Sequence, residues 1–338
     1  MTTLVTGATS GLGLNAVAFL RRRGDSVRAV GRNQAVAPLL SQLGAEFCAA
    51  DLSSATSQDT ERLFNGVSTV WHCAALSSPW GAYEDFYQAN VVVTDKLSDW
   101  AGARGVKVFV HISTPSLYFD YRAHRDIPES YRPSRFVNAY AQTKAMAEDV
   151  IQEAARRYPN TRFVLLRPRA LFGPHDRVVL PRILGLLEKR RGVLPLPAGG
   201  RALVDLTYVE NVIHAMNLAT EASHLPSGAV FNVTNQEPNT LAYVLDRLLR
   251  QELGIEVHIK DVPYPVLDVA ARGLEVLGNL SGKEPPFTRY SIGALNFDMT
   301  LSSTKARQEL GYTPLYSLDE GISRTAKWLK THGRNSHI

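Results

Sequence analysis

The sequence predicts an α/β fold built on a doubly wound parallel sheet, followed by a smaller, mostly helical C-terminal region. Short apolar runs of strand length alternate with helical patterns through the first half of the 338 residues, and a glycine-rich turn joins the first run to the first helix. Beyond about residue 174, prolines interrupt this alternation. Alternating strands and helices form right-handed βαβ units, so the strands are expected to be parallel and covered by helices on both faces.

The first half supplies most of the expected sheet. Its strands are predicted at residues 3–6, 26–30, 45–50, 67–73, 106–113 and 162–167. Its helices are predicted at residues 12–23, 84–104 and 138–158. The run VKVFVHIS at 106–113 has the clearest pattern of a buried strand in the chain.

The second half is predicted to be richer in helix. Helices are expected at 179–190, 209–222, 302–310 and 319–329, and strands at 203–207 and 230–233. A further helix at 263–280 carries apolar residues at helical spacing, including Val266, Leu267 and Leu274. This pattern is compatible with an ordinary core helix or with a helix that caps an apolar pocket.

Composition points to an ordinary soluble globular protein. Apolar residues make up 45% and charged residues 20% of the chain. No basic segment precedes a long apolar stretch, and no run of 18 apolar residues is present, so we expect a cytoplasmic chain without a signal peptide or a membrane span. Cys48 and Cys73 lack metal-ligand spacing, as do the nine histidines, so we expect reduced thiols and no metal site.

The net charge of +5 does not by itself predict a nucleic-acid partner. The basic clusters at 21–23 and 189–191 fall near the ends of predicted helices, where the helix dipole favours cations. No aromatic residues are interleaved with them, so no nucleic-acid surface is expected. A mild positive balance suits an anionic cofactor and an acidic small-molecule substrate.

The glycine-rich turn has the spacing of a phosphate-binding loop. Glycine lets the backbone approach a ligand closely, and the following helix N-terminus presents N–H groups to a pyrophosphate. Because the turn follows a strand and opens a helix, it predicts dinucleotide binding in a Rossmann fold. The candidate residues of this turn are Gly7, Thr9, Ser10, Gly11, Leu12 and Gly13.

The end of the second predicted strand favours NADP(H) over NAD(H). NAD sites place an acidic residue there for the ribose 2′-hydroxyl, whereas this chain has Arg32. A guanidinium can pair with the 2′-phosphate of NADP(H). Asp51 and Leu52, after the third strand, are placed to contact the adenine, although Asp51 is equally suited to a turn.

Tyr140 and Lys144 form a candidate proton-transfer pair. Four residues apart on a helix, they share one face. A phenol has an ordinary pKa of about 10, and a neighbouring cation lowers it by favouring the phenolate. The pair follows the strand that ends at Ser113 and Thr114, and strand C-termini line the ligand crevice of such sheets.

These residues together resemble the extended branch of the short-chain dehydrogenase/reductase superfamily. Within that branch the chain looks most like the 3β-hydroxysteroid dehydrogenase-like group, which includes reductases of 2-alkyl-3-oxoalkanoates; the matching segments are residues 285–290 and 303–314. The superfamily resemblance runs nearly end to end. Beyond the glycine turn and Tyr140/Lys144, it rests on Asp51-Leu52, residues 72–75, Asn90, residues 113–116, Leu166-Arg167-Pro168, Phe172-Gly173-Pro174, residues 205–209 and Phe231-Asn232-Val233.

The resemblance implies roles for individual residues. Tyr140 would exchange a proton with the substrate oxygen, and Lys144 would bind the nicotinamide ribose and lower the pKa of Tyr140. Thr114 would hydrogen-bond the reacting oxygen, with Ser113 and Ser116 as neighbouring substitutes. Asn90 would support a helix kink or a water near Lys144, or simply bond the backbone. The further cofactor contacts would be Cys73, Ala74, Ala75, Ser113 and Pro168.

Two departures from the family pattern leave the pocket shape open. Ser10-Gly11 gives the turn the glycine spacing of the shorter branch, and Phe119 stands where a glycine is common. A carboxylate on the substrate could meet Arg177, Arg182 or Arg289, each of which could equally be structural.

The resemblance also implies an organisation and a function. Residues 1–173, with 200–236 returning, would form the dinucleotide-binding domain, and 174–199 with 237–338 the substrate region. We expect a homodimeric NADP(H)-dependent oxidoreductase acting on a 3-oxo or 3-hydroxy carbon of an apolar substrate, such as a β-keto acid or a steroid. The alternatives are a nucleotide-sugar epimerase or dehydratase and a non-catalytic dinucleotide sensor.

Overall fold

The computed structural model describes residues 1–9, 11–176 and 180–332. Its main sheet has seven strands in the order β12-β7-β5-β4-β1-β2-β3, with every neighbouring pair parallel. The order extends outward from β1 in both directions, which is the doubly wound Rossmann arrangement that the sequence predicts. The strands are β1 (Thr2–Thr6), β2 (Ser26–Gly31), β3 (Glu46–Ala49), β4 (Val67–His72), β5 (Val108–Ile112), β7 (Arg162–Pro168) and β12 (Ala229–Val233).

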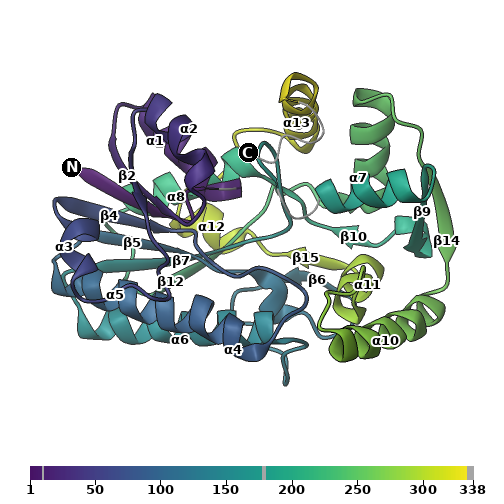
Figure 1. Ribbon diagram of the computed structural model, residues 1–338, viewed down its shortest axis with the longest axis horizontal. Helices are drawn as coiled ribbons and strands as arrows, with labels where there is room; N and C mark the ends of the chain where they lie inside the picture. Colours follow the sequence, from purple (N-terminus) through teal and green to yellow (C-terminus); the bar gives the residue numbers. More distant parts are fainter. Residues whose placement is uncertain (10, 177–179, 333–338) are drawn as a thin grey trace.

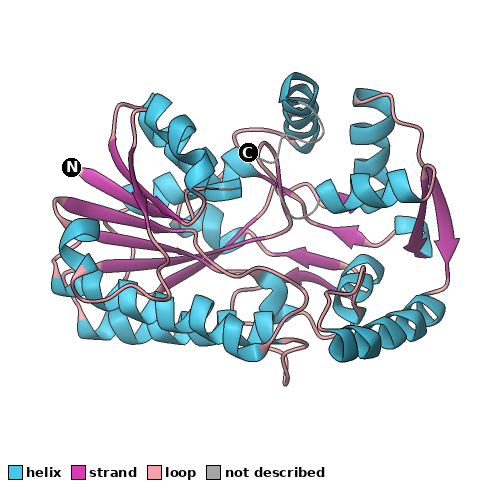
Figure 2. Cartoon of the chain, viewed as in Figure 1, coloured by secondary structure: helices cyan, strands magenta, loops and turns pink. Residues whose placement is uncertain are grey.

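Helices cover both faces of this sheet (Figures 1 and 2). Successive side chains of a strand point to opposite faces, so Leu4 and Val5 of β1 enter two different hydrophobic clusters. The cluster around Val5 contains residues of α1 (Gly11–Arg22), α2 (Ala37–Gln42), α8 (Val209–Glu221), α12 (Thr304–Glu309) and α13 (Leu318–His332). The cluster around Leu4 contains residues of α3 (Asp59–Phe64), α5 (Val93–Ala103) and α6 (Ala139–Arg157).

The helix predicted at 84–104 is interrupted. It consists of α4 (Tyr83–Phe86), a π-helical turn at Tyr87–Val92 and α5. Asn90 lies in this turn, and its side chain bonds both backbone groups of Leu76. Periodicity does not reveal a π turn, because the extra residue shifts the apolar stripe without ending the helix.

The second half contains more strand than the sequence predicts. The predicted strand at 203–207 is wrong: β10 (Leu203–Val204) and β11 (Thr207–Tyr208) belong to different sheets. A four-stranded sheet combines β10 with β13 (Asn239–Thr240), β15 (Met299–Leu301) and β6 (His124–Ile127), and β11 pairs with β8 (Leu171–Phe172). The unpredicted strands β9 (Val193–Pro197) and β14 (His258–Val262) pair only with each other, which leaves the prolines of β9 on an edge, where they are tolerated.

The remaining helices lie in or beside this second half (Figure 1). They are α7 (Leu180–Lys189), α9 (Leu241–Leu245), a π-helical turn at Asp246–Glu252, α10 (Tyr264–Ser281) and α11 (Arg289–Asn296). Short 3-10 helices lie at Gln34–Val36, Pro115–Tyr118 and Ala198–Gly200. The strand β12 returns to the main sheet beside β7, as expected, while the division into two domains stays a prediction.

Helix α10 is not a core helix, contrary to one of the two expectations. It packs through Leu267 and Ala271 against Ile292 of α11. Its opposite side is exposed, with Val269 at 68% and Leu280 at 81% of their full exposure. The sequence pattern showed a helix with apolar residues at helical spacing. Periodicity alone does not show which of those residues are covered by the rest of the protein.

Candidate active site

The glycine turn is shaped by close backbone contacts. Gly7 and Gly11 adopt φ values of 66° and 49°, in the left-handed region that favours glycine. A Cβ on Gly13 would lie 2.2 Å from the carbonyl oxygen of Gly7, and one on Gly7 would lie 2.9 Å from the backbone nitrogen of Ala74. The Gly11 N–H donates to the carbonyl of His175 at 3.2 Å. This turn, at the N-terminus of α1, therefore fits the close approach of a pyrophosphate.

The end of β2 lies beside this turn. A Cβ on Gly31 would lie 2.5 Å from Cγ2 of Thr9, which is buried. Arg32 follows with 77% of its side chain exposed, and its Nη1 is 3.9 Å from Oδ2 of Asp51. At that distance in solvent the ion pair is weak, so the guanidinium remains available to a phosphate. Thr9, Gly31 and Arg32 thus lie together as the sequence predicts; Ser10 lies outside the described residues.

Asp51 stabilises a local turn. Its Oδ1 accepts hydrogen bonds from the backbone N–H and the hydroxyl of Ser53, at 3.0 and 2.7 Å. These bonds lower the pKa of Asp51. The turn role considered from the sequence is therefore present, and Leu52 is buried beside it.

Tyr140 and Thr114 come together where β5 ends. Tyr140 is in the first turn of α6, whose N-cap Asn138 accepts a hydrogen bond from the Ala141 N–H. Thr114 caps the 3-10 helix Pro115–Tyr118. Burial raises the pKa of Tyr140, and hydrogen bonds with Ser77 and Thr114 oppose that rise. The phenol and the threonine hydroxyl can therefore act on one substrate oxygen.

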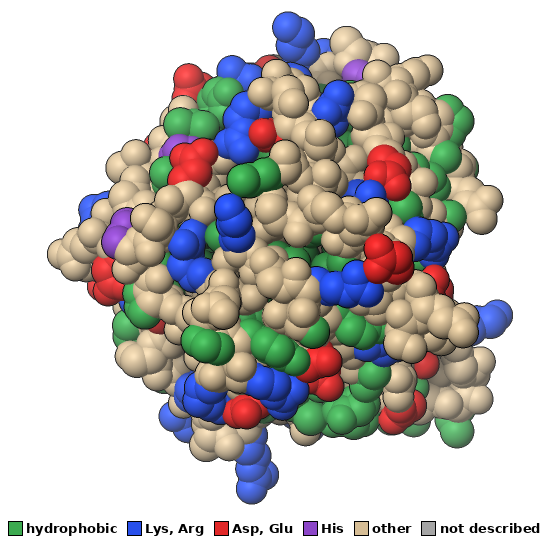
Figure 3. Space-filling view, turned by 90° about the vertical axis from the view of Figure 1, so that its left-hand side faces the viewer, with side chains coloured by type: hydrophobic (Ala, Val, Ile, Leu, Met, Phe, Trp, Pro, Cys, Tyr) green, Lys and Arg blue, Asp and Glu red, His purple; other side chains and the backbone are tan. Residues whose placement is uncertain are grey.

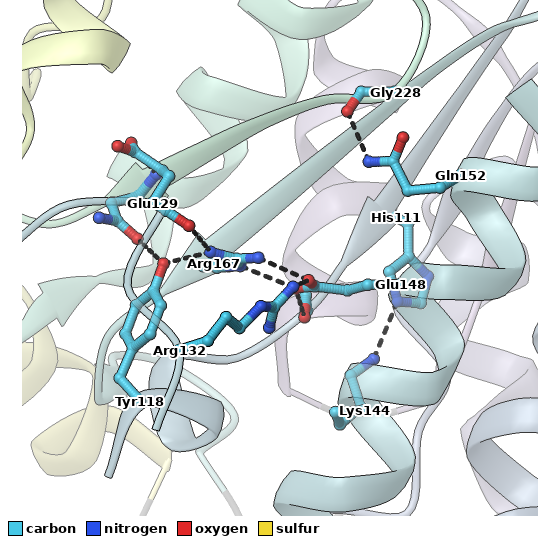
Figure 4. Close-up of polar contacts among 11 residues, drawn as sticks. His111, Tyr118, Glu129, Arg132, Lys144, Glu148, Gln152, Arg167 and Gly228 are labelled. Atoms are coloured by element: carbon cyan, nitrogen blue, oxygen red, sulfur yellow. Dashed lines mark hydrogen bonds and ion pairs between the residues drawn. The ribbon is translucent and has the colours of Figure 1, made fainter. Parts of the chain in front are cut away.

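Lys144 is buried one turn further along α6. Its Nζ donates to the carbonyl of Ile112 at 2.7 Å and lies 3.1 Å from Nε2 of His111, as Figure 4 shows for the histidine contact. Burial lowers the pKa of Lys144 to about 8, and Glu148 opposes this. An ammonium has three donors, so one remains for a cofactor hydroxyl. The lowering of the Tyr140 pKa by Lys144 stays a prediction, because the ammonium here faces the β5 backbone.

A second histidine lies beneath this pair. The His72 and His111 ring centroids are 5.2 Å apart. The Thr94 hydroxyl donates to the Asn90 carbonyl, so it accepts from Nε2 of His72, while Nδ1 of His72 is 2.7 Å from Thr6 Oγ1. Burial lowers the pKa of His72 to about 3 and that of His111 well below its usual value. Both imidazoles are therefore neutral beneath Lys144.

Asn90 and Ser113 have partners that the sequence did not indicate. Nδ2 of Asn90 donates to the Thr143 hydroxyl at 3.2 Å, so Asn90 joins the π-helical turn to the residue before Lys144. The Ser113 hydroxyl donates to Oε1 of Glu148 at 2.5 Å. The side chain of Asn90 bonds the Leu76 backbone, which was one of its two possible roles, while its support of the kink stays a prediction. The hydroxyl of Ser113 donates inside the protein rather than to a cofactor.

The remaining predicted contacts lie at the same edge of the sheet. Burial raises the pKa of the partly buried Cys73 thiol to about 12, so it stays protonated. The Ala74 N–H donates to the Thr6 hydroxyl at 3.2 Å. Ala75 is exposed, and Pro168 is buried at the end of β7. Their contacts with a cofactor stay predictions.

A buried ion pair joins β7 to α6, the helix that carries Tyr140 and Lys144 (Figure 4). Nε and Nη2 of Arg167 donate to the two oxygens of Glu148 at 2.8 and 2.6 Å. Arg132 adds a third bond to Glu148 at 2.8 Å, and the Tyr118 hydroxyl also bonds Arg167. These contacts keep the pKa of Glu148 low despite its burial. The family resemblance includes Arg167 but not Glu148, although Glu148 lies four residues after Lys144 on the same helix.

The candidate carboxylate-binding arginines have other partners. Arg182 pairs with Glu284 at 2.8 Å, and Arg289 pairs with Asp268 at 2.8 Å. Arg177 lies outside the described residues. A residue not singled out, Tyr290, places its hydroxyl 2.6 Å from Oγ of Ser116, which accepts a bond from Thr114 at 3.0 Å. Tyr290 thus extends the line of hydroxyls that begins at Tyr140.

Other kinds of site receive no support in the described part of the chain. No group of three or more potential ligands there could hold a metal ion. Among the same residues, no helix has the length and apolar character needed to cross a membrane. On the face shown in Figure 3, Lys and Arg side chains are interspersed with Asp and Glu.

Comparison with known proteins places this site in a family. The model of the NAD dependent epimerase/dehydratase family matches residues 3–234. The chain belongs to this family. A 2-alkyl-3-oxoalkanoate reductase of Stenotrophomonas maltophilia is 32% identical over 96% of this chain and 98% of its own. Such relatives place this epimerase/dehydratase-family chain among the extended short-chain dehydrogenases/reductases, in the 3β-hydroxysteroid dehydrogenase-like group, and identify it as a nicotinamide-dependent oxidoreductase.

Two further relatives cover nearly the whole chain. A protein of Escherichia coli K12 named YbjS is 52% identical over 99% of both chains. A ketoreductase of a farnesylated dihydroquinoline oxide from Stigmatella aurantiaca is 31% identical over 95% of both chains. Among solved structures, the UDP-glucuronic acid 4-epimerase of Bacillus cereus with NAD superposes with a TM-score of 0.78 at 20% identity, over 99% of this chain and 98% of that one. At that identity the likeness establishes the fold of this family member.

Proposed function

We propose that this protein reduces the 3-oxo group of an apolar substrate, or oxidises the matching 3-hydroxy group, with NADP(H). The observation that carries the proposal is the placement of Tyr140 and Thr114 together at the end of β5, beside the buried side chain of Lys144. Two relatives of matching length are named as reductases of 3-oxo compounds that carry a farnesyl or an alkyl group. A β-keto acid is the preferred substrate class and a steroid the second.

The residues of the chain supply the proton chemistry. Thr114 and Tyr140 hydrogen-bond the substrate oxygen, and the Tyr140 hydroxyl gives it a proton as the alcohol forms. The remaining donor of Lys144 would bind a ribose hydroxyl of the cofactor, and the proton that Tyr140 gives up returns from solvent. The nicotinamide, when bound, supplies the hydride. In the oxidative direction each proton moves the opposite way.

The glycine turn and Arg32 would hold the cofactor. Gly7, Gly11 and Gly13 form the cradle that an added Cβ would fill, at the start of α1. The exposed guanidinium of Arg32 would bind the 2′-phosphate, which favours NADP(H). We propose a cytoplasmic homodimer as the working form.

A substrate screen tests the function. Absorbance at the NADPH band is followed with 2-alkyl-3-oxo acids, a 3-oxosteroid and UDP-sugars, and in reverse with NADP⁺ and the stable 3-hydroxy acids. We expect turnover with the acids and none with UDP-sugars. Conversion of a UDP-sugar to its epimer without net change at the NADPH band, on nucleotide that stays bound through purification, would instead identify an epimerase.

A further inference from the structure

Arg169 occupies a fixed position beside the catalytic edge of the sheet. It directly follows β7, whose carboxyl end lies next to that of β5. Its backbone N–H donates to the Val233 carbonyl at 3.1 Å, and its carbonyl accepts from the Thr207 hydroxyl at 2.5 Å. The backbone is therefore held from two sides, and only the side chain is left to adapt to a ligand.

The guanidinium of Arg169 lacks a protein partner among the described residues. Its Nε is shielded from solvent and makes no hydrogen bond. Arg167, two residues earlier, instead bonds Glu148, Tyr118 and a backbone carbonyl. Desolvation of this half-buried side chain is costly, because it disfavours the charge and so lowers the pKa of Arg169. An anionic ligand would remove that cost.

The surroundings of Arg169 connect it to the reacting groups. Tyr290 and Asp205 are the titratable groups that act on it electrostatically. The Tyr290 hydroxyl bonds Ser116, and Ser116 bonds Thr114. Arg169 therefore interacts electrostatically with Tyr290, whose hydroxyl is linked through Ser116 to Thr114.

Asp205 does not neutralise Arg169 directly. Oδ2 of Asp205 accepts the Leu301 N–H at 2.7 Å, and no ion pair within 4.0 Å joins it to Arg169 in the described structure. Burial raises the pKa of Asp205 to about 6, and Arg169 and the Leu301 N–H oppose the rise. The carboxyl is thus engaged with the β15 backbone and leaves the donors of Arg169 for another anion.

We propose that Arg169 binds the carboxylate of the substrate, so that this enzyme selects free 3-oxo or 3-hydroxy acids over their esters and over neutral ketones. The inference rests on the proposed function, and it deepens that function by naming the group that is recognised. A planar guanidinium suits a carboxylate because two parallel N–H groups match its two oxygens. Arg182 and Arg289 already have carboxylate partners within the protein.

Binding measurements test this assignment without turnover. A 2-alkyl-3-hydroxy acid and its methyl ester are titrated by calorimetry into wild-type protein saturated with NADPH, which cannot take a hydride from the hydroxy compound. Wild type is expected to bind the acid at least about 10-fold more tightly, as a charge-assisted pair would give. Arg169→Met should abolish this preference, and Arg169→Lys should restore part of it, since lysine keeps the charge without the fork.

Arg201→Met is the matched control, because Arg201 pairs with Asp261 on the surface with 69% of its side chain exposed. It should keep the preference for the acid. Equal binding of acid and ester by wild type, or binding of neither, would overturn the assignment, as would a preference that survives in Arg169→Met. A different result would contradict the proposed function itself: wild type that turns over neither 3-oxo acids nor neutral ketones. Thermal unfolding of Arg169→Met should occur at the same temperature as wild type or at a higher one, because the lost charge leaves no partner behind and its desolvation cost is removed.

Discussion

Nε2 of His111 lies 3.1 Å from Nζ of Lys144, with both side chains buried beneath the catalytic edge of the sheet. An ammonium can only donate, so the imidazole accepts and carries its own proton on Nδ1, which has no partner in the described structure. The neutral imidazole of His111 thus replaces one of the hydrogen bonds to water that the Lys144 ammonium loses on burial. Beyond His111, the groups acting on Lys144 are Glu148, Cys73 and His72.

His111→Phe is expected to shift the pH profile of catalysis. The pKa of Lys144 is about 8, below its usual 10.5, so the ammonium is lost as the pH rises through about 8. Removal of the acceptor makes the charged form costlier still, and the alkaline fall in kcat/KM should move to lower pH. His111→Gln keeps a hydrogen-bond acceptor, so it should shift the alkaline fall in kcat/KM less. A profile unchanged in folded His111→Phe would exclude this role.

Tyr140→Phe is expected to reduce turnover by at least about 100-fold, because general acid catalysis contributes that much or more. Cofactor binding should change little, since the ring and its packing against Phe86 remain. Steady-state rates and a fluorescence titration with NADPH measure the two effects. Turnover that persists in the variant would transfer the proton role to another hydroxyl, with Thr114 the first candidate.

Arg32→Ala should weaken NADPH binding by about 10-fold and leave NADH binding nearly unchanged, because one exposed charge-assisted pair to the 2′-phosphate is lost. The difference in NADPH affinity between wild type and Arg32→Ala should become smaller as salt is added, because salt screens the charge pair. Arg156→Ala is the control, since Arg156 is exposed on α6 and pairs with Glu153. Equal affinity of wild type for NADH and NADPH would remove the basis for the preference.

Gly13→Ala should lose cofactor binding together with about 1–3 kcal/mol of stability. The new Cβ would lie 2.2 Å from the Gly7 carbonyl oxygen, so the glycine turn must move away from α1. Gly273→Ala serves as the control, because nothing lies within 4 Å of a Cβ there. Denaturant unfolding and NADPH titration would show the contrast; a Gly13→Ala protein that binds normally would mean that the turn can relax.

The sequence predicted what depends on local pattern. The strands of the main sheet, the glycine turn and the Tyr140–Lys144 spacing each lie within one segment, so periodicity and spacing were enough. What it missed depends on contacts between segments: Glu148 meets Arg167 across α6 and β7, and Tyr290 meets Ser116 over a separation of 174 residues. The short strands β9 and β14 were missed because prolines and charges obscure any alternation. No spacing rule encodes such pairings.

Glu148→Gln is expected to destabilise the fold by about 3–5 kcal/mol at pH 7, because it leaves Arg167 buried without its counter-charge. The Glu148 pKa is lowered from 4.5 in the folded protein, so its contribution is present above about pH 4.5 and is lost as the pH falls through the folded value. Urea unfolding at pH 7 and at successively lower pH measures the free energy of unfolding of both proteins. The difference between wild type and variant should become smaller as the pH falls.

Glu153→Gln on the same helix provides the comparison. Glu153 also pairs with an arginine, Arg156, but both side chains are more than half exposed, so its loss should change stability little at either pH. If the two variants lose equal stability, burial is not the reason that the Glu148–Arg167 ion pair contributes to the stability of the fold. A large loss for Glu148→Gln alone, with NADPH affinity also reduced, would show that this ion pair holds α6, and with it Tyr140 and Lys144, against the sheet.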